Sequence, residues 1–472
     1  MITLTLLAIF ALLLTLGLTP MCRLVCRRLG WVDYPGPRKV HQEPIPRTGG
    51  IAIFMGYAGA MFVLLLYPVR HGMFATGMFP GMRALLPAIV VAFATGLLDD
   101  VLGLKPWMKL LGQFAAAALA CNAGVQIHNL AGFSIADTWW HVPLTIVWLV
   151  GCANAFNLID GLDGLAVGVG IFATATALFS ALLSGNIALA LMTAPLLGAL
   201  LGFLPYNFSP ASIFMGDCGS LTVGFLLGCF GVIWSAKAAT VLGMTAPLIA
   251  LAIPLLDTAL AIARRFLRHQ PIFGADRRHI HHRLLARGLT PRRAAYVIYA
   301  GAGAVAALAL LAGSSHAGGV ALVLFCVAVA LAVHFLGYEE FDAARHMIFG
   351  GMFHRVLNGK LAVTRFERAI QSAATLDECW EALVQTSRDF GVSSAALHIQ
   401  GREFTVVIAQ VSPADCWDLT IPINGSGHLH WSVPFNWQTN AAIAPLALSM
   451  RTVLGARLNT FPPLPKAREV SA

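Results

Sequence analysis

Charged residues are scarce in this sequence. Only 11% of its 472 residues are Asp, Glu, Lys or Arg, and 58% are hydrophobic, whereas a soluble domain carries about 25% charged residues. This composition excludes a purely soluble globular protein. The mean hydropathy of +0.75 instead predicts an all-α polytopic membrane protein, and the length leaves room for a further domain.

The sequence also lacks two motifs, and their absence narrows the possible classes of function. No segment matches G-x-x-x-x-G-K-[ST], so the phosphate-binding loop of many NTPases is missing. Cys22 and Cys26 are four residues apart, but no second pair completes a metal-binding set, and we interpret all nine cysteines as reduced structural residues. The first apolar run, from Ile2, lacks a basic start and a small-residue cleavage site, and it therefore predicts a retained helix.

Hydropathy and helix breakers predict about eleven membrane spans. Basic residues concentrate in alternate loops, above all in 22–48 and 265–293, whereas the intervening loops carry only Arg70, Arg83 and Lys237. The positive-inside rule then puts the basic loops and the tail in the cytoplasm, and it explains the net charge of +9 without a nucleic-acid partner. The expected spans are 2–21, 49–69, 84–102, 109–126, 142–158, 164–183, 187–204, 219–235, 244–264, 294–312 and 319–336.

The composition changes near residue 337, where the apolar spans end. We therefore expect a transmembrane domain over 1–336 and a small cytoplasmic α+β domain over 337–472. Before that point, the outside loop 127–141 alternates like a short hairpin, followed by Trp139 and Trp140 at the membrane interface. In the tail, the pattern predicts helices over 366–390 and 440–458, with strands over 393–398, 404–409, 417–422 and 428–433.

The stretch 154–164 concentrates polar side chains between two apolar runs. It contains Asn154, Asn157, Asp160 and Asp163 within ten residues. Charge at a membrane boundary is costly, so we interpret this cluster as a functional site. The alternative is a polar loop that happens to be acidic, but two more acid-bearing segments recur at the same predicted membrane face.

Those two segments lie at predicted helix ends. Asp99 and Asp100 end the third span, and such a carboxylate pair can bind a divalent cation or supply a base. Asp217 and Ser220 precede or begin the eighth span, and glycines on both sides of Asp217 permit a sharp turn. The alternatives are a solvated charge pair for the first segment and an ordinary N-cap for the second.

Two basic cytoplasmic segments complete the pattern. The first contains Arg38, Lys39 and His41, and the second contains the run His279-Ile280-His281-His282 among arginines. Histidines can bind zinc, but arginine neighbours without a cysteine suit a diphosphate better. Ordinary basic loops are the alternative. Acids for Mg²⁺ and cations for phosphate together predict metal-assisted phosphoryl transfer to a membrane lipid.

Five motifs in this order resemble the polyprenyl-phosphate N-acetylhexosamine-1-phosphate transferases of glycosyltransferase 4 type. These enzymes join a UDP-amino sugar to a membrane polyprenyl phosphate and release UMP. The resemblance covers roughly residues 1–336. The motifs are Arg38-Lys39-x-His41 with Gly49-Gly50, Asp99-Asp100, Asn154-x-x-Asn157-x-x-Asp160-Gly-x-Asp163-Gly, Asn207 through Phe214-Met-Gly-Asp217-x-Gly-Ser220, and His279-x-His281-His282.

The resemblance implies a role for each motif. Asp217 would hold Mg²⁺, with Mn²⁺ as the alternative, helped by Asp99 and Asp100, and Asp99 would be the base that deprotonates or orients the lipid phosphate. The motifs leave open whether transfer takes one step or passes through an aspartyl phosphate. The implied substrate-binding residues are Arg38, Lys39, His41, Asn154, Asn157, Asp160, Asp163, Asn207, Phe214 as a stacking partner for uracil, His279, His281 and His282.

Within this family, the chain resembles the branch that uses UDP-GlcNAc and undecaprenyl phosphate, because it has eleven expected spans and a His-Ile-His-His run. Phospho-MurNAc-pentapeptide transferases, the alternative, typically have ten spans and a three-histidine run. A transporter, the rival of another class, would put its acids near the bilayer midplane. The tail faintly resembles a GAF-like domain, which implies regulation or docking of a glycan-assembly partner, with a purely structural tail as the alternative. We expect a bacterial inner membrane protein with a cytoplasmic active site, and a homodimer is left open.

Overall fold

The structure is a computed structural model. The chain separates into two compact units, Met1–Gly337 and Tyr338–Ala472. The structure describes residues 1–35, 43–66, 79–130, 133–134, 139–236, 249–267, 279–312, 317–336, 352–399, 402–412, 415–423, 427–435 and 446–461.

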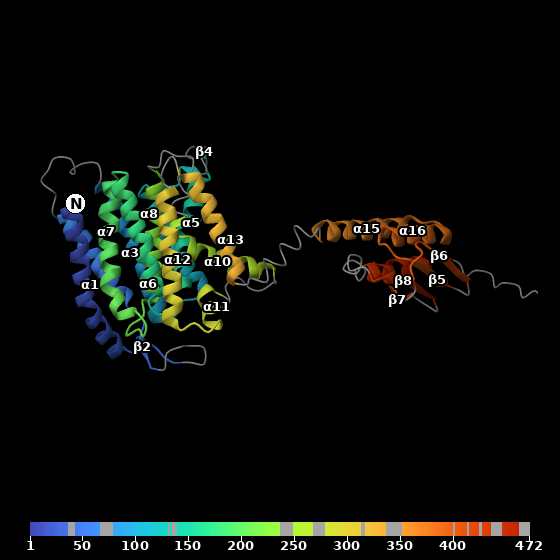
Figure 1. The fold of residues 1–472 in the computed structure, drawn as a ribbon, viewed down its shortest axis with the longest axis horizontal. Helices are drawn as coiled ribbons and strands as arrows, with labels where there is room; N and C mark the ends of the chain where they lie inside the picture. The colour runs from blue at the N-terminus through green and yellow to red at the C-terminus, as the bar shows by residue number, and fades with distance from the viewer. Residues whose placement is uncertain are drawn as a thin grey trace, which may run out of the picture. The chain divides into compact units, whose positions relative to one another are not determined.

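The first unit is a bundle of helices (Figure 1), and each expected span overlaps one of them. Seven helices, α1, α3, α5, α6, α7, α8 and α12, are long and apolar enough to cross a membrane, so the protein is a membrane protein, while the total of eleven spans stays a prediction. The helices are α1 (Ile2–Leu29), α2 (Gly50–Leu66), α3 (Phe79–Leu102), α4 (Pro106–Asn122), α5 (His141–Ile159), α6 (Leu165–Leu183), α7 (Ile187–Asn207), α8 (Gly216–Ala236), α10 (Ala252–Leu267), α11 (Ile280–Ala286), α12 (Pro291–Ala312) and α13 (Gly318–Leu336).

Short antiparallel strand pairs mark the two ends of this bundle. Strand β1 (Val32–Asp33) pairs with β2 (Ile45–Pro46), and β3 (Asn129–Leu130) pairs with β4 (Phe133–Ser134). In Figure 1, β2 and α11 lie at one end of the bundle and β4 at the other. The β3–β4 pair confirms the hairpin expected within 127–141.

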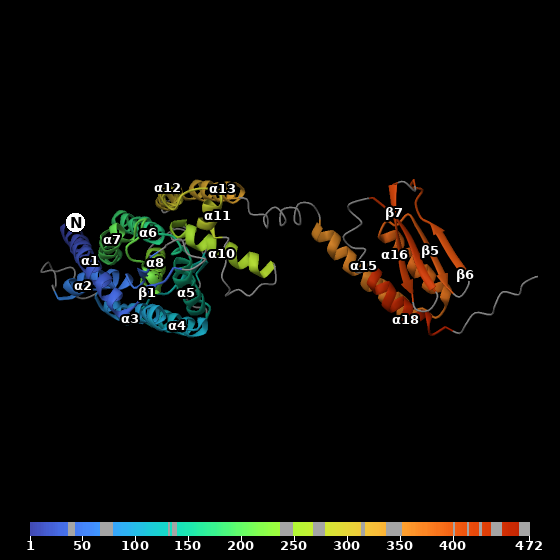
Figure 2. The same cartoon turned by 90° about the horizontal axis from the view of Figure 1, so that it is seen from below.

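Helix α8 lies at the centre of the bundle, as the view in Figure 2 shows. Glycines let its neighbours approach closely: a Cβ added at Gly224 would lie 2.6 Å from the Cβ of Phe156 in α5. A Cβ at Gly96 of α3 would collide with the backbone of Asp217 at the start of α8. Close packing of α3, α5 and α8 therefore brings three helix ends together at the β2 end of the bundle.

One expected span differs in detail. Of the span predicted over 244–264, the structure describes the residues from 249 onward. A turn at Leu251 precedes α10. Pro254 lies in the first turn of α10, where a missing N–H costs no hydrogen bond. The proline therefore favours a helix start here over a continuous helix.

The second unit packs helices on one face of a four-stranded antiparallel sheet (Figure 1). The strand order is β6-β5-β8-β7, and alternate residues such as Leu397, Leu429 and Trp431 face the core. The helices and sheet agree with the expected α+β class, and the GAF-like resemblance stays a prediction. The elements are α15 (Met352–Ser372), α16 (Leu376–Asp389), β5 (Ser394–Ile399), β6 (Arg402–Val407), β7 (Cys416–Ile423), β8 (Gly427–Pro434), a π-helical turn Met450–Leu454 and α18 (Gly455–Leu458).

The stretch 366–390 is largely helical, as expected, but a break at 373–375 divides it between α15 and α16. The Thr375 side chain accepts a hydrogen bond from the Glu378 N–H at 3.2 Å, and the Glu378 carboxylate accepts one from the Ala374 N–H at 2.6 Å. This arrangement is a variant of the capping box in which Glu378 reaches the N–H of the residue before the cap, and a new helix starts at Leu376. Apolar periodicity alone did not reveal it.

Candidate active site

Three helices bring two carboxylates and one lysine ammonium together at the β2 end of the bundle. Asp99 lies near the end of α3, Asp217 in the first turn of α8, and Lys109 in the first turn of α4. The Lys109 ammonium forms an ion pair with Asp217 and lies 3.1 Å from Asp99 Oδ2. Two carboxylates from distant parts of the sequence therefore converge on one cationic group.

Asn157 of α5 orients the second oxygen of the Asp217 carboxylate. Its amide nitrogen donates to Asp217 Oδ1 at 2.9 Å and lies 2.8 Å from Ser220 Oγ. Asp217 is thus held from both sides, by Asn157 on one oxygen and by Lys109 on the other. This arrangement fixes the direction in which the carboxylate faces.

Asp100 has different surroundings from its neighbour Asp99. It is only 5% exposed, and its two oxygens accept hydrogen bonds from the backbone N–H groups of Asp217 at 3.0 Å and Cys218 at 2.9 Å. A carboxylate at a helix N-terminus satisfies free N–H groups and complements the helix dipole. Asp100 therefore anchors the start of α8, and through it the backbone that carries Asp217.

The Gly49-Gly50 motif lies directly against the segment that precedes α8. The Gly49 N–H donates to the Phe214 carbonyl at 2.9 Å, and the Phe214 N–H donates to the Pro46 carbonyl at 2.8 Å. A Cβ at Gly50 would collide with the backbone of Gly219. Two sequence motifs that are more than 160 residues apart thus form one backbone layer beside Asp217.

Asn207 and Asp163 shape the loops around the site through backbone hydrogen bonds. Asn207 accepts from the Gly164 N–H at 3.1 Å and donates to the Ile213 carbonyl at 3.0 Å. The Asp163 carboxylate accepts from the Ala211 N–H at 2.9 Å. These bonds tie the loop at 160–164 to the loop at 208–213.

Asp160 follows the last residue of α5 and is half-buried. Burial, with the carboxylates of Asp100 and Asp163 nearby, raises the pKa of Asp160 to about 7. A carboxyl group with such a pKa can exchange a proton near neutral pH, which is common at functional sites.

The histidine run lies beside the 160–164 loop. A Cβ added at Gly161 would be 2.7 Å from His281 Nε2, and the rings of His281 and His282 are 4.3 Å apart. Burial, helped by His282, lowers the pKa of His281 to about 4, so this ring is neutral at pH 7. His279 Nδ1 lies 2.9 Å from the buried Asp257 carboxylate.

The structure thus brings most predicted site residues to one end of the bundle. Asn154 differs from the other predicted site residues because its side chain forms hydrogen bonds with Gln113, at 2.5 and 3.3 Å. Arg38, Lys39 and His41 lie outside the described residues. In the part of the chain that the structure describes, no group of three or more His, Cys, Asp or Glu side chains could hold a metal ion by itself.

Comparison with known proteins decides the family. The glycosyl transferase family 4 model matches residues 82–235. The probable undecaprenyl-phosphate N-acetylglucosaminyl 1-phosphate transferase of Bacillus subtilis (strain 168) is 37% identical, over 62% of this chain and 80% of that relative. The chain belongs to glycosyl transferase family 4. It is therefore an enzyme, a phosphotransferase, as the sequence resemblance implied.

Two further relatives are similar over nearly the same share of the chain. The decaprenyl-phosphate N-acetylglucosaminephosphotransferase of Mycobacterium tuberculosis (strain CDC 1551 / Oshkosh) is 36% identical, over 64% of this chain and 81% of the relative. The undecaprenyl-phosphate alpha-N-acetylglucosaminyl 1-phosphate transferase of Escherichia coli (strain K12) is 30% identical, over 62% of this chain and 80% of the relative.

Sequence reasoning missed Lys109, Gln113 and Asp257. Lys109 and Gln113 stand one turn apart in an otherwise apolar segment, and Asp257 is a lone acid inside another. Polar side chains in predicted spans are expensive and face protein partners. A polar side chain inside a predicted span is therefore the signal that marks Lys109, Gln113 and Asp257.

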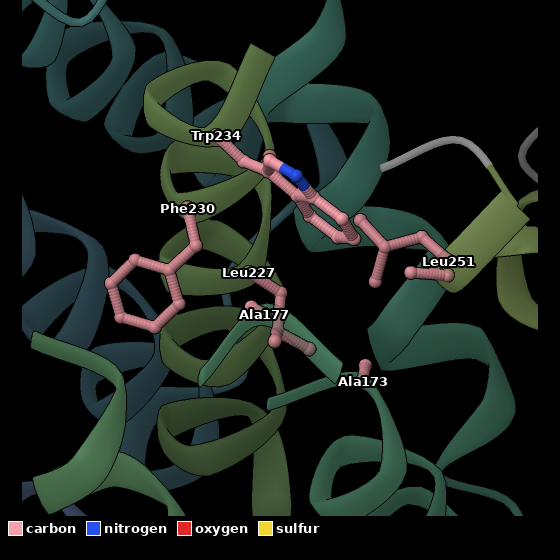
Figure 3. A pocket seen from close by; sticks show the side chains of 8 residues that line it. Ala173, Ala177, Leu227, Phe230, Trp234 and Leu251 are labelled. Atoms are coloured by element: carbon pink, nitrogen blue, oxygen red, sulfur yellow. The ribbon is translucent and has the colours of Figure 1, made fainter. Parts of the chain in front are cut away.

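A small apolar pocket lies away from these polar residues (Figure 3). Ala173 and Ala177 of α6, Leu227, Phe230 and Trp234 of α8, and Leu251 before α10 line it. Trp234 is 17 residues beyond Asp217 on α8, which is about 25 Å along a helix. The pocket offers no charged group to a phosphate, so it is not the phosphoryl-transfer site.

Proposed function

We propose that the protein transfers N-acetylglucosamine 1-phosphate from UDP-GlcNAc to undecaprenyl phosphate and releases UMP. The convergence of Asp99, Asp217 and Lys109 at one end of a membrane bundle is the observation that carries this proposal. The names of the three relatives, all N-acetylglucosamine phosphotransferases that use a polyprenyl phosphate, support the donor and acceptor. The positive-inside rule supports a bacterial inner membrane with this end in the cytoplasm.

The acids present fit a magnesium ion, which the family resemblance implies. Mg²⁺ usually binds one or two carboxylates together with substrate phosphates, and it rarely has an all-protein cage. Asp217 and Asp99 already point carboxylate oxygens at one positive charge, the Lys109 ammonium. We propose that these two residues would hold Mg²⁺ with the donor diphosphate. Bound there, Mg²⁺ would neutralise charge on the diphosphate.

The proposed reaction exchanges one bond at the β-phosphorus of the donor. An oxygen of the lipid phosphate forms a new bond to that phosphorus, and the bond to the bridging oxygen breaks. The bridging oxygen and its electron pair leave with UMP. Asp99 would accept or orient a proton on the lipid phosphate, while Lys109 would stabilise negative charge on the leaving phosphate.

The remaining residues would position the donor. Asn157 fixes Asp217, and Asp100 fixes the backbone at the start of α8. The loop at 160–164, with the histidine run beside it, and Phe214 would bind the uridine, the sugar and the diphosphate. Carboxylates at helix ends, away from the bilayer midplane, support an enzyme over a transporter.

The test uses full-length protein purified in detergent, with UDP-GlcNAc and undecaprenyl phosphate. We expect UMP release that requires Mg²⁺ or Mn²⁺ and stops on chelation. Asp217→Asn should abolish this release, because an amide loses the negative charge. A panel of UDP-sugars, including UDP-MurNAc-pentapeptide, tests the donor. No UMP from any donor would refute the proposed function, and full activity of Asp217→Asn would refute the metal assignment.

A further inference from the structure

Asp257 is a buried acid that the proposed reaction does not use. It lies on α10 and is only 2% exposed. Its Oδ1 accepts a hydrogen bond from the Ile280 N–H at 3.0 Å, and its Oδ2 lies 2.9 Å from His279 Nδ1. Burial of a carboxylate without hydrogen-bond partners costs free energy. The two contacts therefore stabilise Asp257 in its buried position, and they point to its role.

His279 is the first member of a packed series of rings. It is 6% exposed, and its ring lies parallel to that of His281, with centroids 5.9 Å apart and an interplanar angle of 5°. His281 in turn lies against Gly161 in the 160–164 loop. The orientation of His279 is therefore transmitted by packing to the ring that faces the loop.

The contact of Asp257 with Nδ1 also decides where the proton of His279 sits. An ionised carboxylate only accepts hydrogen bonds, so a neutral His279 must carry its proton on Nδ1. The nitrogen on the other side of the ring, Nε2, is then left as an acceptor. Without a partner, a neutral imidazole can place its proton on either nitrogen.

We propose that Asp257 is a positioning residue that holds the Nδ1–H tautomer of His279 and thereby fixes the histidine run against the 160–164 loop. This role deepens the proposed function, because it concerns the same site. A purely structural role as a hydrogen-bond acceptor for Ile280 would not require a particular tautomer. The tautomer is therefore the property to measure.

Asp257→Asn separates the two roles. The asparagine oxygen can still accept from the Ile280 N–H, so the start of α11 keeps its hydrogen bond. The new amide faces Nδ1 and can only donate there, so His279 must move its proton to Nε2. Thr258→Val is the matched control, because Thr258 is the next residue on α10 and its buried hydroxyl has no hydrogen-bond partner among the residues that the structure describes.

The experiment records ¹⁵N spectra of full-length protein in detergent at pH 8, with histidine-specific labelling and a His279→Gln variant to assign the signal. We expect a neutral ring with the proton on Nδ1 in the wild type and in Thr258→Val. We expect the proton on Nε2 in Asp257→Asn. Any other state of His279 in the wild type overturns the proposal, and this measurement needs no variant of Asp257 to fold.

A second readout uses UMP release from UDP-GlcNAc. We expect Asp257→Asn and His279→Gln each to lower kcat/KM by about tenfold, and the double variant to lose no more than either one, because residues that act as a unit are not additive. Independent, additive losses overturn the proposal. If the wild type releases no UMP, the proposed function fails, while the tautomer measurement still decides the role of Asp257.

Discussion

Lys109 and Asp217 form an ion pair between α4 and α8, although 108 residues separate them in the sequence. The same ammonium reaches Asp99 on α3. One cation therefore holds the ends of three helices and compensates two carboxylates at a membrane boundary. Removal of the Lys109 ammonium would therefore leave the negative charges of Asp99 and Asp217 partly buried and uncompensated.

We predict that Lys109→Met lowers kcat by about 100-fold or more, since a preorganised cation beside developing negative charge commonly supplies this much. Lys105→Met is the matched control, because Lys105 immediately precedes α4 and is exposed. UMP release by both variants checks the prediction. Equal losses in the two variants, or unchanged kcat in Lys109→Met, would contradict a specific role for this ion pair.

Asp100 and Asp99 are adjacent but should respond differently to substitution. Asp100→Ala leaves the buried N–H of Cys218 and the partly buried N–H of Asp217 without their acceptor, and a buried unsatisfied donor costs about 1–3 kcal/mol. We therefore predict a clear fall in the melting temperature for Asp100→Ala, measured in detergent. Asp99→Ala should lower kcat with a much smaller change in melting temperature. The opposite pattern would show that the two roles are exchanged.

The buried His281 predicts how stability depends on pH. Its pKa falls from 6.5 to about 4 on folding, so the unfolded state binds more protons between these values. The contribution of His281 to stability is then largest above pH 6.5 and declines as the pH falls toward 4, by at most about 1.4 kcal/mol per pH unit. The raised pKa of Asp160 acts in the opposite direction over the same range, so the His281 contribution is measured as the difference in melting temperature between the wild type and His281→Gln from pH 7.5 to 4.5. This difference should shift against the wild type as the pH falls.

The sequence predicted the positions of the helices well, because long apolar runs have few alternatives in a membrane. It also predicted that Asp99, Asp217 and the 160–164 loop would share one face. What it could not supply was the difference between Asp99 and Asp100. Adjacent residues on a helix point about 100° apart, and only the packing of α3 against α8 decides which carboxylate turns inward.

Partnerships between distant polar residues were equally hidden. The amide pair of Gln113 and Asn154 joins α4 to α5, one helical turn from Lys109. The sequence places Asn154 in the polar stretch 154–164, and the family resemblance implied that it binds substrate; neither pointed to Gln113 as its partner. A side chain's partner depends on the three-dimensional arrangement of the neighbouring helix, and the local pattern does not encode it.

The candidate site residues all belong to the first unit, Met1–Gly337, which has its own core. The sheet unit has a separate core that includes Trp431 and Leu383. A truncated protein ending at residue 345 should therefore keep kcat/KM for UMP release within about twofold of the full chain, because separate cores fold independently. The measurement compares both proteins after each has shown a cooperative melting transition. A well-folded truncated protein without turnover would show that the second unit takes part in catalysis.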